Sequence, residues 1–193
     1  MMREDRRLFM RQMGALALSF ATPAQANGLR LDYAMQGNVS PAPAGNAEPS
    51  FLWLARNGER ARFNFATPDG YNQAAWFLRD VRAGVVGRPN PDLLRLIAWT
   101  QGYLAVYGYD VPYDVHSGLR TPWTNRRTEG ASRASMHLPD KHGMFHAMDY
   151  SARGLTPDYL SKLLSYPRFG GVGRYDNRNF VHADVGRIRS WRG

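Results

Sequence analysis

The sequence predicts an α+β fold in which helices pack on a small antiparallel sheet. Helix-like patterns come early in the domain, and strand-like patterns gather in its later part. The regular strand–helix–strand alternation that builds a parallel sheet is not seen. At 193 residues, 44% of them hydrophobic, the chain suits one compact domain with a core and an appendage.

The domain begins with a hairpin followed by a helix. Asn57-Gly58 joins predicted strands over 51–56 and 60–65, because this dipeptide favours a tight hairpin turn. In the next segment, 71–82, apolar residues recur at helical spacing.

A second helix is expected over 92–107. Asn90 is a suitable N-cap, and Pro91 lies just inside the first turn, where its missing N–H is not needed. The segment that follows, 111–117, has an extended pattern.

The last third of the chain contains a further helix between two strands. The strands are expected over 144–150 and 179–185. Between them Thr156 caps a predicted helix over 157–164, which Pro167 ends.

The residues before the domain look like an export signal and a spacer. Arg6 and Arg7 lead into a short apolar run and then the small-x-small site Ala24-Gln25-Ala26, a layout typical of secretory signals. The paired arginines resemble the twin-arginine export signal. An amphipathic first helix is the alternative interpretation. We expect a signal peptide over 1–26, cleaved after Ala26, a linker over 27–50 and the folded domain over 51–193.

Composition excludes several kinds of site and partner. The chain has no cysteine, so disulfides, thiolate metal ligands and a cysteine nucleophile are excluded. No stretch reaches the roughly eighteen apolar residues of a membrane-spanning helix. The net charge of +9 favours an anionic partner. Because no nucleic-acid-binding motif accompanies this charge, cell-wall polymer or a phospholipid surface fits at least as well.

Histidines in the second half of the chain raise the question of a metal site. Clustering of His and Asp in a chain without Cys fits zinc held by nitrogen and oxygen. Alternation in the predicted strand 179–185 sets His182 and Asp184 on one face, toward a cleft. In 144–150, Asp149 lies on the face opposite to His146. The five histidines are at positions 116, 137, 142, 146 and 182.

A series of motifs carries a resemblance to a known family. In this order they resemble the zinc D-Ala-D-Ala metallopeptidases, whose fold is shared with sonic hedgehog. The branch most similar is the twin-arginine-exported murein endopeptidases of Gram-negative bacteria. The likeness spans about 52–191. The motifs are Ser117-Gly118-Leu119-Arg120-Thr121, Asn125, Gly130-Ala131, Ser135-Met136-His137, Ala147-Met148-Asp149, Gly170-Gly171-Val172-Gly173, Phe180-Val181-His182-Ala183-Asp184-Val185-Gly186 and Trp191.

The resemblance implies a catalytic zinc site. By position, His137, Asp149 and His182 would bind Zn2+, with water as the fourth ligand. Arg120 would contact substrate carbonyl or carboxylate groups. The family commonly places its Asp seven residues after the first His, a spacing that His142 has and His137 lacks. Because the run up to His137 matches without a gap, we interpret 138–142 as a loop insertion and keep His142 as the alternative ligand.

The position of the catalytic base also differs from the family pattern. Many relatives have Glu or Asp three residues before the last ligand, where this chain has Asn179, which cannot accept a proton at neutral pH. Asp184 is then the candidate base, with orientation of His182 as its alternative role. We expect Asp176 to be a turn residue, and His116 to pack beside the cleft or contact substrate.

The sequence therefore predicts a periplasmic zinc peptidase. It would hydrolyse amide bonds in peptidoglycan stem peptides or crosslinks as an endopeptidase or carboxypeptidase. Its expected partners are peptidoglycan peptides and the twin-arginine export machinery, not nucleic acid, and we expect a monomer. The alternative is a non-catalytic, zinc-containing module that binds the cell wall, because a fold alone does not establish activity.

Overall fold

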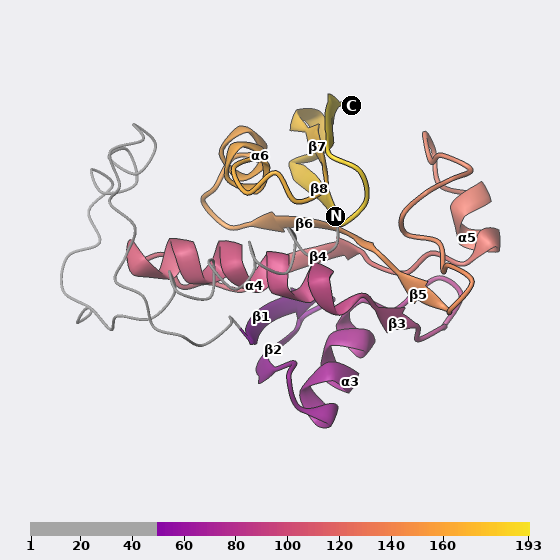
Figure 1. Cartoon of the computed structure of the whole chain (residues 1–193), viewed down its shortest axis with the longest axis horizontal. Coiled ribbons are helices and arrows are strands. Elements are labelled where there is room, and N and C mark those ends of the chain that lie inside the picture. The colour runs from indigo at the N-terminus through magenta and orange to yellow at the C-terminus, as the bar shows by residue number, and fades with distance from the viewer. Residues whose placement is uncertain (1–49) are drawn as a thin grey trace, which may run out of the picture.

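The computed structural model describes residues 50–193 (Figure 1). The predicted signal peptide, and all but the last residue of the predicted linker, lie outside the described residues. Strands β1 (Phe51–Arg56) and β2 (Glu59–Asn64) form the expected hairpin. Asn57 and Gly58 both have positive φ, at 51° and 84°, as this type of two-residue turn requires.

The four α-helices within residues 50–193 follow one pattern at their N-termini. They are α3 (Pro68–Phe77), α4 (Pro91–Val106), α5 (Pro122–Arg126) and α6 (Pro157–Ser165). Each begins with proline, and each is capped by the side chain before it, which accepts a backbone N–H of the first turn. The caps are Thr67, Asn90, Thr121 and Thr156.

Helix α3 begins and ends several residues before its predicted range, 71–82. Hydrogen bonds of Asp80 explain why the helix ends early. The Asp80 backbone pairs with Val85, and its carboxylate accepts the backbone N–H groups of Ala83, at 3.1 Å, and Thr121, at 2.8 Å. These bonds turn the chain away from a helical path just after α3. They also connect the loop that follows α3 to the segment that contains Arg120.

The sheet has seven strands in the order β2-β1-β4-β6-β8-β7-β9. Most pairs are antiparallel, but β1–β4 and β7–β9 are parallel. The α+β class is confirmed, while the sheet is larger than expected and not purely antiparallel. A separate parallel pair joins β3 (Arg88–Pro89) to β5 (Met144–Phe145). The remaining strands are β4 (Tyr113–Ser117), β6 (Ala147–Ala152), β7 (Gly171–Tyr175), β8 (Phe180–Asp184) and β9 (Arg189–Arg192).

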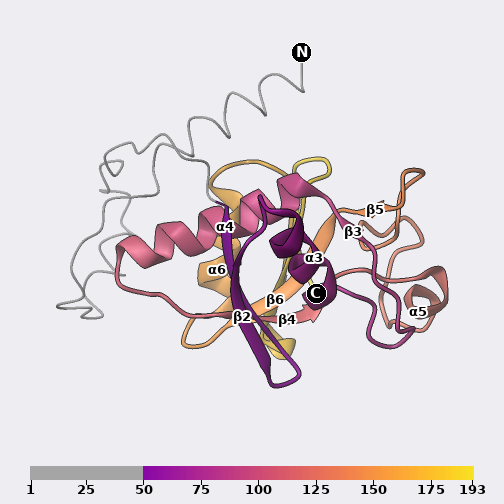
Figure 2. The same ribbon diagram turned by 90° about the horizontal axis from the view of Figure 1, so that it is seen from below.

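One face of the sheet is buried beneath helices. Phe63 of β2 stacks on Phe77 of α3, with ring centroids 5.9 Å apart, and the Tyr113 hydroxyl of β4 contacts Thr100 of α4 at 3.2 Å. Helix α6 packs on β7 and β8. Helices α3 and α4 pack beside the β1–β2 hairpin, as Figure 2 shows. Since alternate residues point to opposite faces, Asp149 and His182 lie on the other face of the sheet.

The predicted strand 144–150 is interrupted at His146. Its backbone N–H donates to the Met136 carbonyl at 2.8 Å, and its carbonyl accepts the Val185 N–H at 3.2 Å. These bonds divide the segment into β5 and β6. They also tie the loop before His137 to the end of β8, so three chain segments meet beside Asp149.

We expect Asp80→Ala to destabilise the fold by about 1–3 kcal/mol, because it leaves two backbone N–H groups without their acceptor. Chemical denaturation of the full chain measures the effect. The exposed Asp114→Ala is the matched control, for which a change within about 0.5 kcal/mol is expected. Equal stability of both variants would show that Asp80 does not fasten the two segments.

Candidate metal centre

The centre is built across two paired strands and one loop. Asp149 on β6 and His182 on β8 are direct partners in the antiparallel register. His137 lies on the loop before β5, where its carbonyl accepts the Arg120 N–H at 2.9 Å and its own N–H donates to the Ser135 hydroxyl at 3.3 Å. The sheet therefore fixes two of the side chains, and local hydrogen bonds bring the third to them.

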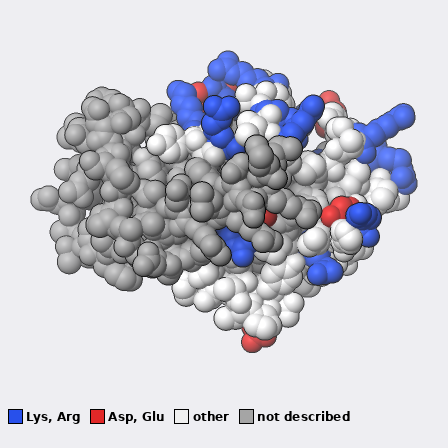
Figure 3. Space-filling model, in the orientation of Figure 1, with Lys and Arg blue, Asp and Glu red and all other residues white. Residues whose placement is uncertain are grey.

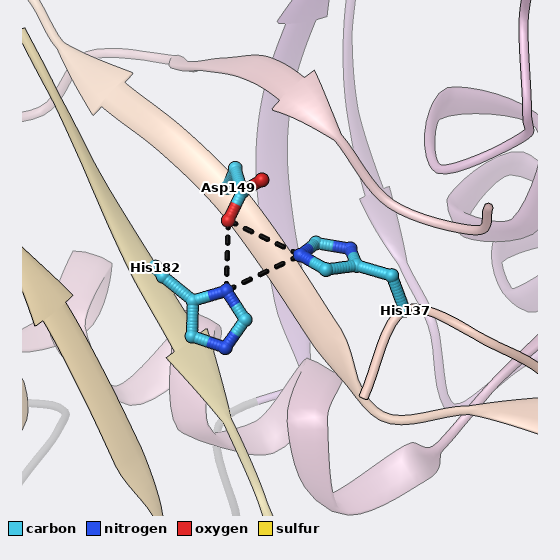
Figure 4. A group of neighbouring side chains, drawn as sticks. All are labelled: His137, Asp149 and His182. Atoms are coloured by element: carbon cyan, nitrogen blue, oxygen red, sulfur yellow. Dashed lines mark hydrogen bonds and ion pairs between the residues drawn. The ribbon is translucent and has the colours of Figure 1, made fainter. Parts of the chain in front are cut away.

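Three donor atoms face one another at this point (Figure 4). His137 Nε2 lies 3.2 Å from Asp149 Oδ1 and 3.2 Å from His182 Nδ1, and the last two atoms are 2.8 Å apart. Ligand atoms about 2.0–2.1 Å from a tetrahedral zinc lie about 3.3 Å from each other. The spacing therefore fits a single metal ion.

Hydrogen bonds on the far side of each ring determine which nitrogen faces the centre. His137 Nδ1–H donates to the Gly118 carbonyl at 2.5 Å, and His182 Nε2–H donates to Asp184 at 2.9 Å. A metal ion bound by the inner nitrogens would keep the ring protons on these outer nitrogens, where the carbonyl and carboxylate oxygens accept them. The inner nitrogens then turn lone pairs toward the Asp149 carboxylate, the arrangement that metal-binding histidines show.

Burial and charge act on the protonation of these groups. The three side chains are almost fully buried, with exposed fractions of 1%, 4% and 7% for His137, Asp149 and His182. Burial lowers the pKa of His137 and so favours the neutral imidazole. Burial alone would raise the pKa of Asp149, but the two histidines outweigh it and hold that pKa well below its usual range. A neutral imidazole and an ionised carboxylate are the forms that bind metal.

The pKa of His182 moves in the opposite direction. Burial of its ring would lower this pKa, but hydrogen bonds to Asp149 and Asp184 raise it above the ordinary value. A metal ion at the centre would therefore compete with a proton for Nδ1 of His182.

Arg120 holds the outer oxygen of Asp149. Its Nη2 group donates to Asp149 Oδ2, and its Nε–H donates to the Ser117 hydroxyl at 2.9 Å. The Asp149 carboxylate is thus oriented with Oδ1 toward the histidines and Oδ2 toward the guanidinium. Arg120 contacts the centre through a proposed ligand, a contact that the sequence did not reveal.

Asp184 shares the face of His182, as the strand alternation predicts, but it is fully buried and does not line a cleft. Its carboxylate accepts the backbone N–H groups of Gly171, at 3.0 Å, and Gly186, at 2.8 Å, together with two N–H groups of Arg189. With His182 Nε2 as a further donor, the carboxylate is held from several directions. It meets His182 on the side of the ring away from the three donor atoms.

The other candidates lie apart from the three donor atoms. His142 is exposed on the loop over 138–143, which Asp140 closes by accepting the His142 and Met144 N–H groups at 2.8 and 3.0 Å. Asp176 begins the 3-10 turn over 176–178 and pairs with Arg174. Within residues 50–193, the His137, Asp149 and His182 group is the one in which three potential ligand atoms come within 4.8 Å of one another.

His116 lies on the same face of the sheet as the centre, because alternation along β4 points it away from the side of the buried Tyr113 and Val115. Next to it the register with β6 shifts, so that Val115 pairs with Tyr150 and Ser117 with Asp149. The His116 ring stacks on Phe180 with centroids 5.5 Å apart, and its Nε2 lies 2.8 Å from the Ser151 hydroxyl. The His116 side chain is exposed on this face, and its role beside the centre stays a prediction.

Comparison with known proteins places the chain among peptidases. A model of the Peptidase M15 family matches residues 71–184. The peptidoglycan L,D-endopeptidase MepK of Escherichia coli K12 is 31% identical over 173 residues, which cover 82% of this chain and 91% of that protein. A Haemophilus influenzae protein named as a probable peptidoglycan L,D-endopeptidase MepK is 27% identical over 177 residues, 86% of this chain and 91% of its own length. No solved structure gives a significant match.

We expect His137→Ala to abolish stoichiometric zinc binding, because it removes one of three converging donors. His142→Ala, in an exposed position on the neighbouring loop, should retain the metal and is the matched control. Elemental analysis of the purified full-length variants measures both. The reverse pattern, with metal kept in His137→Ala and lost in His142→Ala, would move the ligand to His142.

Proposed function

Because the chain belongs to the Peptidase M15 family, we propose that it is a zinc metallopeptidase that hydrolyses amide bonds in peptidoglycan stem peptides or crosslinks. The observation that carries this proposal is the convergence of His137 Nε2, Asp149 Oδ1 and His182 Nδ1 at 2.8–3.2 Å. The names of the relatives support the substrate class and favour an endopeptidase that recognises an L,D bond over a carboxypeptidase.

Zinc is the metal that this donor set fits best. Two imidazole nitrogens and one carboxylate oxygen are a common catalytic zinc set, and the chain has no cysteine to offer a thiolate. Three protein ligands leave a fourth position for water or substrate. A zinc ion held by the three protein ligands would supply a nucleophilic water at neutral pH and polarise the scissile carbonyl.

Arg120 is proposed to have two functions. Its contact with Asp149 Oδ2 orients the carboxylate, and its Nη1 group makes no hydrogen bond with the protein among residues 50–193. This free N–H pair can donate to a substrate carbonyl or carboxylate. A guanidinium so close to the centre would also stabilise negative charge that develops on the carbonyl oxygen during hydrolysis.

Hydrolysis of an amide adds water across the C–N bond, so one group must accept a proton from water and the leaving amine must gain one. Asp184 is the base that the sequence suggests, yet its carboxylate is buried and bonded to the outer nitrogen of His182. We therefore assign it the alternative role, orientation of His182. His116, exposed on the metal-bearing face, is our candidate for proton transfer.

The proposed location is the periplasm, with export through the twin-arginine route and cleavage of the signal after Ala26. Relatives that act on peptidoglycan support an extracytoplasmic site of action. No helix within residues 50–193 is long and apolar enough to cross a membrane. In Figure 3, Lys and Arg gather mainly over the upper and right-hand parts of the visible described surface, and this positive charge favours an anionic cell-wall polymer. We propose a monomer with no nucleic-acid partner.

We expect the purified chain to cleave muropeptides when zinc is present, and a chelator to abolish cleavage until zinc is restored. Mass spectrometry of the products identifies the bond that is cut. His182→Ala, which lacks a proposed ligand, is the inactive control. Intact muropeptides in a preparation with stoichiometric zinc would instead support the alternative function, a zinc-containing module that binds the cell wall without turnover.

The roles of Asp184 and His116 predict opposite effects of two substitutions. Asp184→Asn should weaken zinc affinity about ten- to a hundredfold, because it disturbs the partner of a ligand. His116→Gln should leave zinc affinity unchanged and lower turnover by about a hundredfold or more, the usual contribution of proton transfer by a side chain. Zinc titration and muropeptide hydrolysis are measured on the same preparations.

Two results would reverse these assignments. Full zinc affinity with a hundredfold loss of turnover in Asp184→Asn would make Asp184 the base. Full activity in His116→Gln would remove His116 from the reaction.

A further inference from the structure

The last strand of the domain lies beyond the region that matches the family model. That match ends at residue 184, whereas β9 spans Arg189–Arg192 and pairs in parallel with β7 at the edge of the sheet. Within this pair Arg189 lies opposite Gly171. Strand β9 therefore brings an arginine to the part of the sheet where Asp184 is buried.

Arg189 donates two hydrogen bonds to the Asp184 carboxylate. Its Nη1 lies 3.1 Å from Oδ1 and its Nη2 lies 2.6 Å from Oδ2. Two parallel bonds between a guanidinium and a carboxylate fix both the position and the plane of the acid. The same Nη1 also donates to the Arg187 carbonyl at 3.1 Å, which fixes the guanidinium in turn.

The chain makes room for this pair at Gly171. A Cβ atom at residue 171 would lie 2.4 Å from Nη1 of Arg189 and 2.5 Å from Oδ2 of Asp184. Glycine is therefore needed where β7 passes beneath the ion pair. The Gly171 N–H donates to Asp184 Oδ1 at 3.0 Å, so the same residue also helps to orient the carboxylate.

A single carboxylate oxygen links Arg189 to the centre. Oδ2 of Asp184 accepts both from Arg189 Nη2, at 2.6 Å, and from His182 Nε2, at 2.9 Å. The orientation of the His182 ring about its last side-chain bond is intrinsically only weakly restricted. The hydrogen bond to Asp184 stabilises the ring orientation in which Nδ1 points toward Asp149 and His137. It can do so only if the Asp184 carboxylate itself has a fixed position.

Asp184 depends on Arg189 because it is fully buried. A buried carboxylate is costly unless it is paired with a positive charge and hydrogen-bonded. The backbone N–H groups of Gly171 and Gly186 bind Oδ1, so Arg189 is the charged partner that holds Oδ2 beside His182. Its guanidinium also lies over the Trp191 ring at 4.9 Å, and that ring is 5.1 Å from His182.

We infer that Arg189 is a positioning residue of the metal centre, which fixes the coordinating nitrogen of His182 by holding Asp184 from strand β9. The inference rests on the proposed function, because it requires His182 to bind metal through Nδ1. It adds to that proposal the requirement for a C-terminal strand that lies outside the matched family region.

The test is zinc affinity of the full-length chain, measured by competition with a chromogenic chelator. Arg189→Ala should weaken binding about ten- to a hundredfold, the usual effect of losing a partner behind a ligand. Arg189→Lys should give an intermediate loss, since an ammonium cannot form two parallel bonds with a carboxylate. Arg187→Ala removes an exposed positive charge from the same loop and should bind zinc as the unaltered chain does.

A second readout separates positioning from general stability. The visible absorption of Co2+ bound in place of zinc reports ligand geometry, and it should change in Arg189→Lys even if circular dichroism shows an intact fold. Unchanged zinc affinity and an unchanged Co2+ spectrum in the Arg189 variants would overturn the inference while leaving the proposed function intact. Failure of the unaltered chain to bind zinc would overturn both.

Discussion

Two imidazole nitrogens and one carboxylate oxygen face each other at 2.8–3.2 Å, and lone pairs held this close repel one another unless a proton or a metal ion lies between them. This constraint explains the surrounding hydrogen bonds. The Gly118 carbonyl, Asp184 and Arg120 each hold the outer side of one donor group. Folding supplies the free energy that brings the three donor groups together, which is how proteins preorganise metal sites.

The fold meets this constraint by using the two faces of one sheet differently. Side chains such as Tyr113, Tyr150 and Val181 are buried on the face that packs against the helices, where they belong to the hydrophobic core. The opposite face then carries polar groups at fixed positions, because antiparallel register sets Asp149 directly beside His182. Only His137 comes from a loop, and the backbone bonds of that loop hold it firmly.

Much of this arrangement could be predicted from the sequence, and the exceptions have physical causes. Caps such as Asn90 and Thr156 act locally, so the starts of their helices were predicted to within one residue. Alternation correctly set His182 and Asp184 on one face. The parallel strand β9 and the Arg189–Asp184 pair were missed, because a short edge strand leaves no periodic pattern and a contact between strands depends on tertiary packing. The hydrogen bond that the outer nitrogen of His182 donates to Asp184 could likewise be found only from the structure.

X-ray absorption spectroscopy of the zinc-loaded full-length chain tests the central claim most directly. If His137, Asp149 and His182 bind one zinc ion, the spectrum should show four light-atom ligands at about 2.0–2.1 Å, with outer-shell scattering from two imidazole rings. The imidazole signal should fall to one ring in His137→Ala. A spectrum with six oxygen ligands and no imidazole scattering would contradict the account, because it would place the metal away from the three donor atoms.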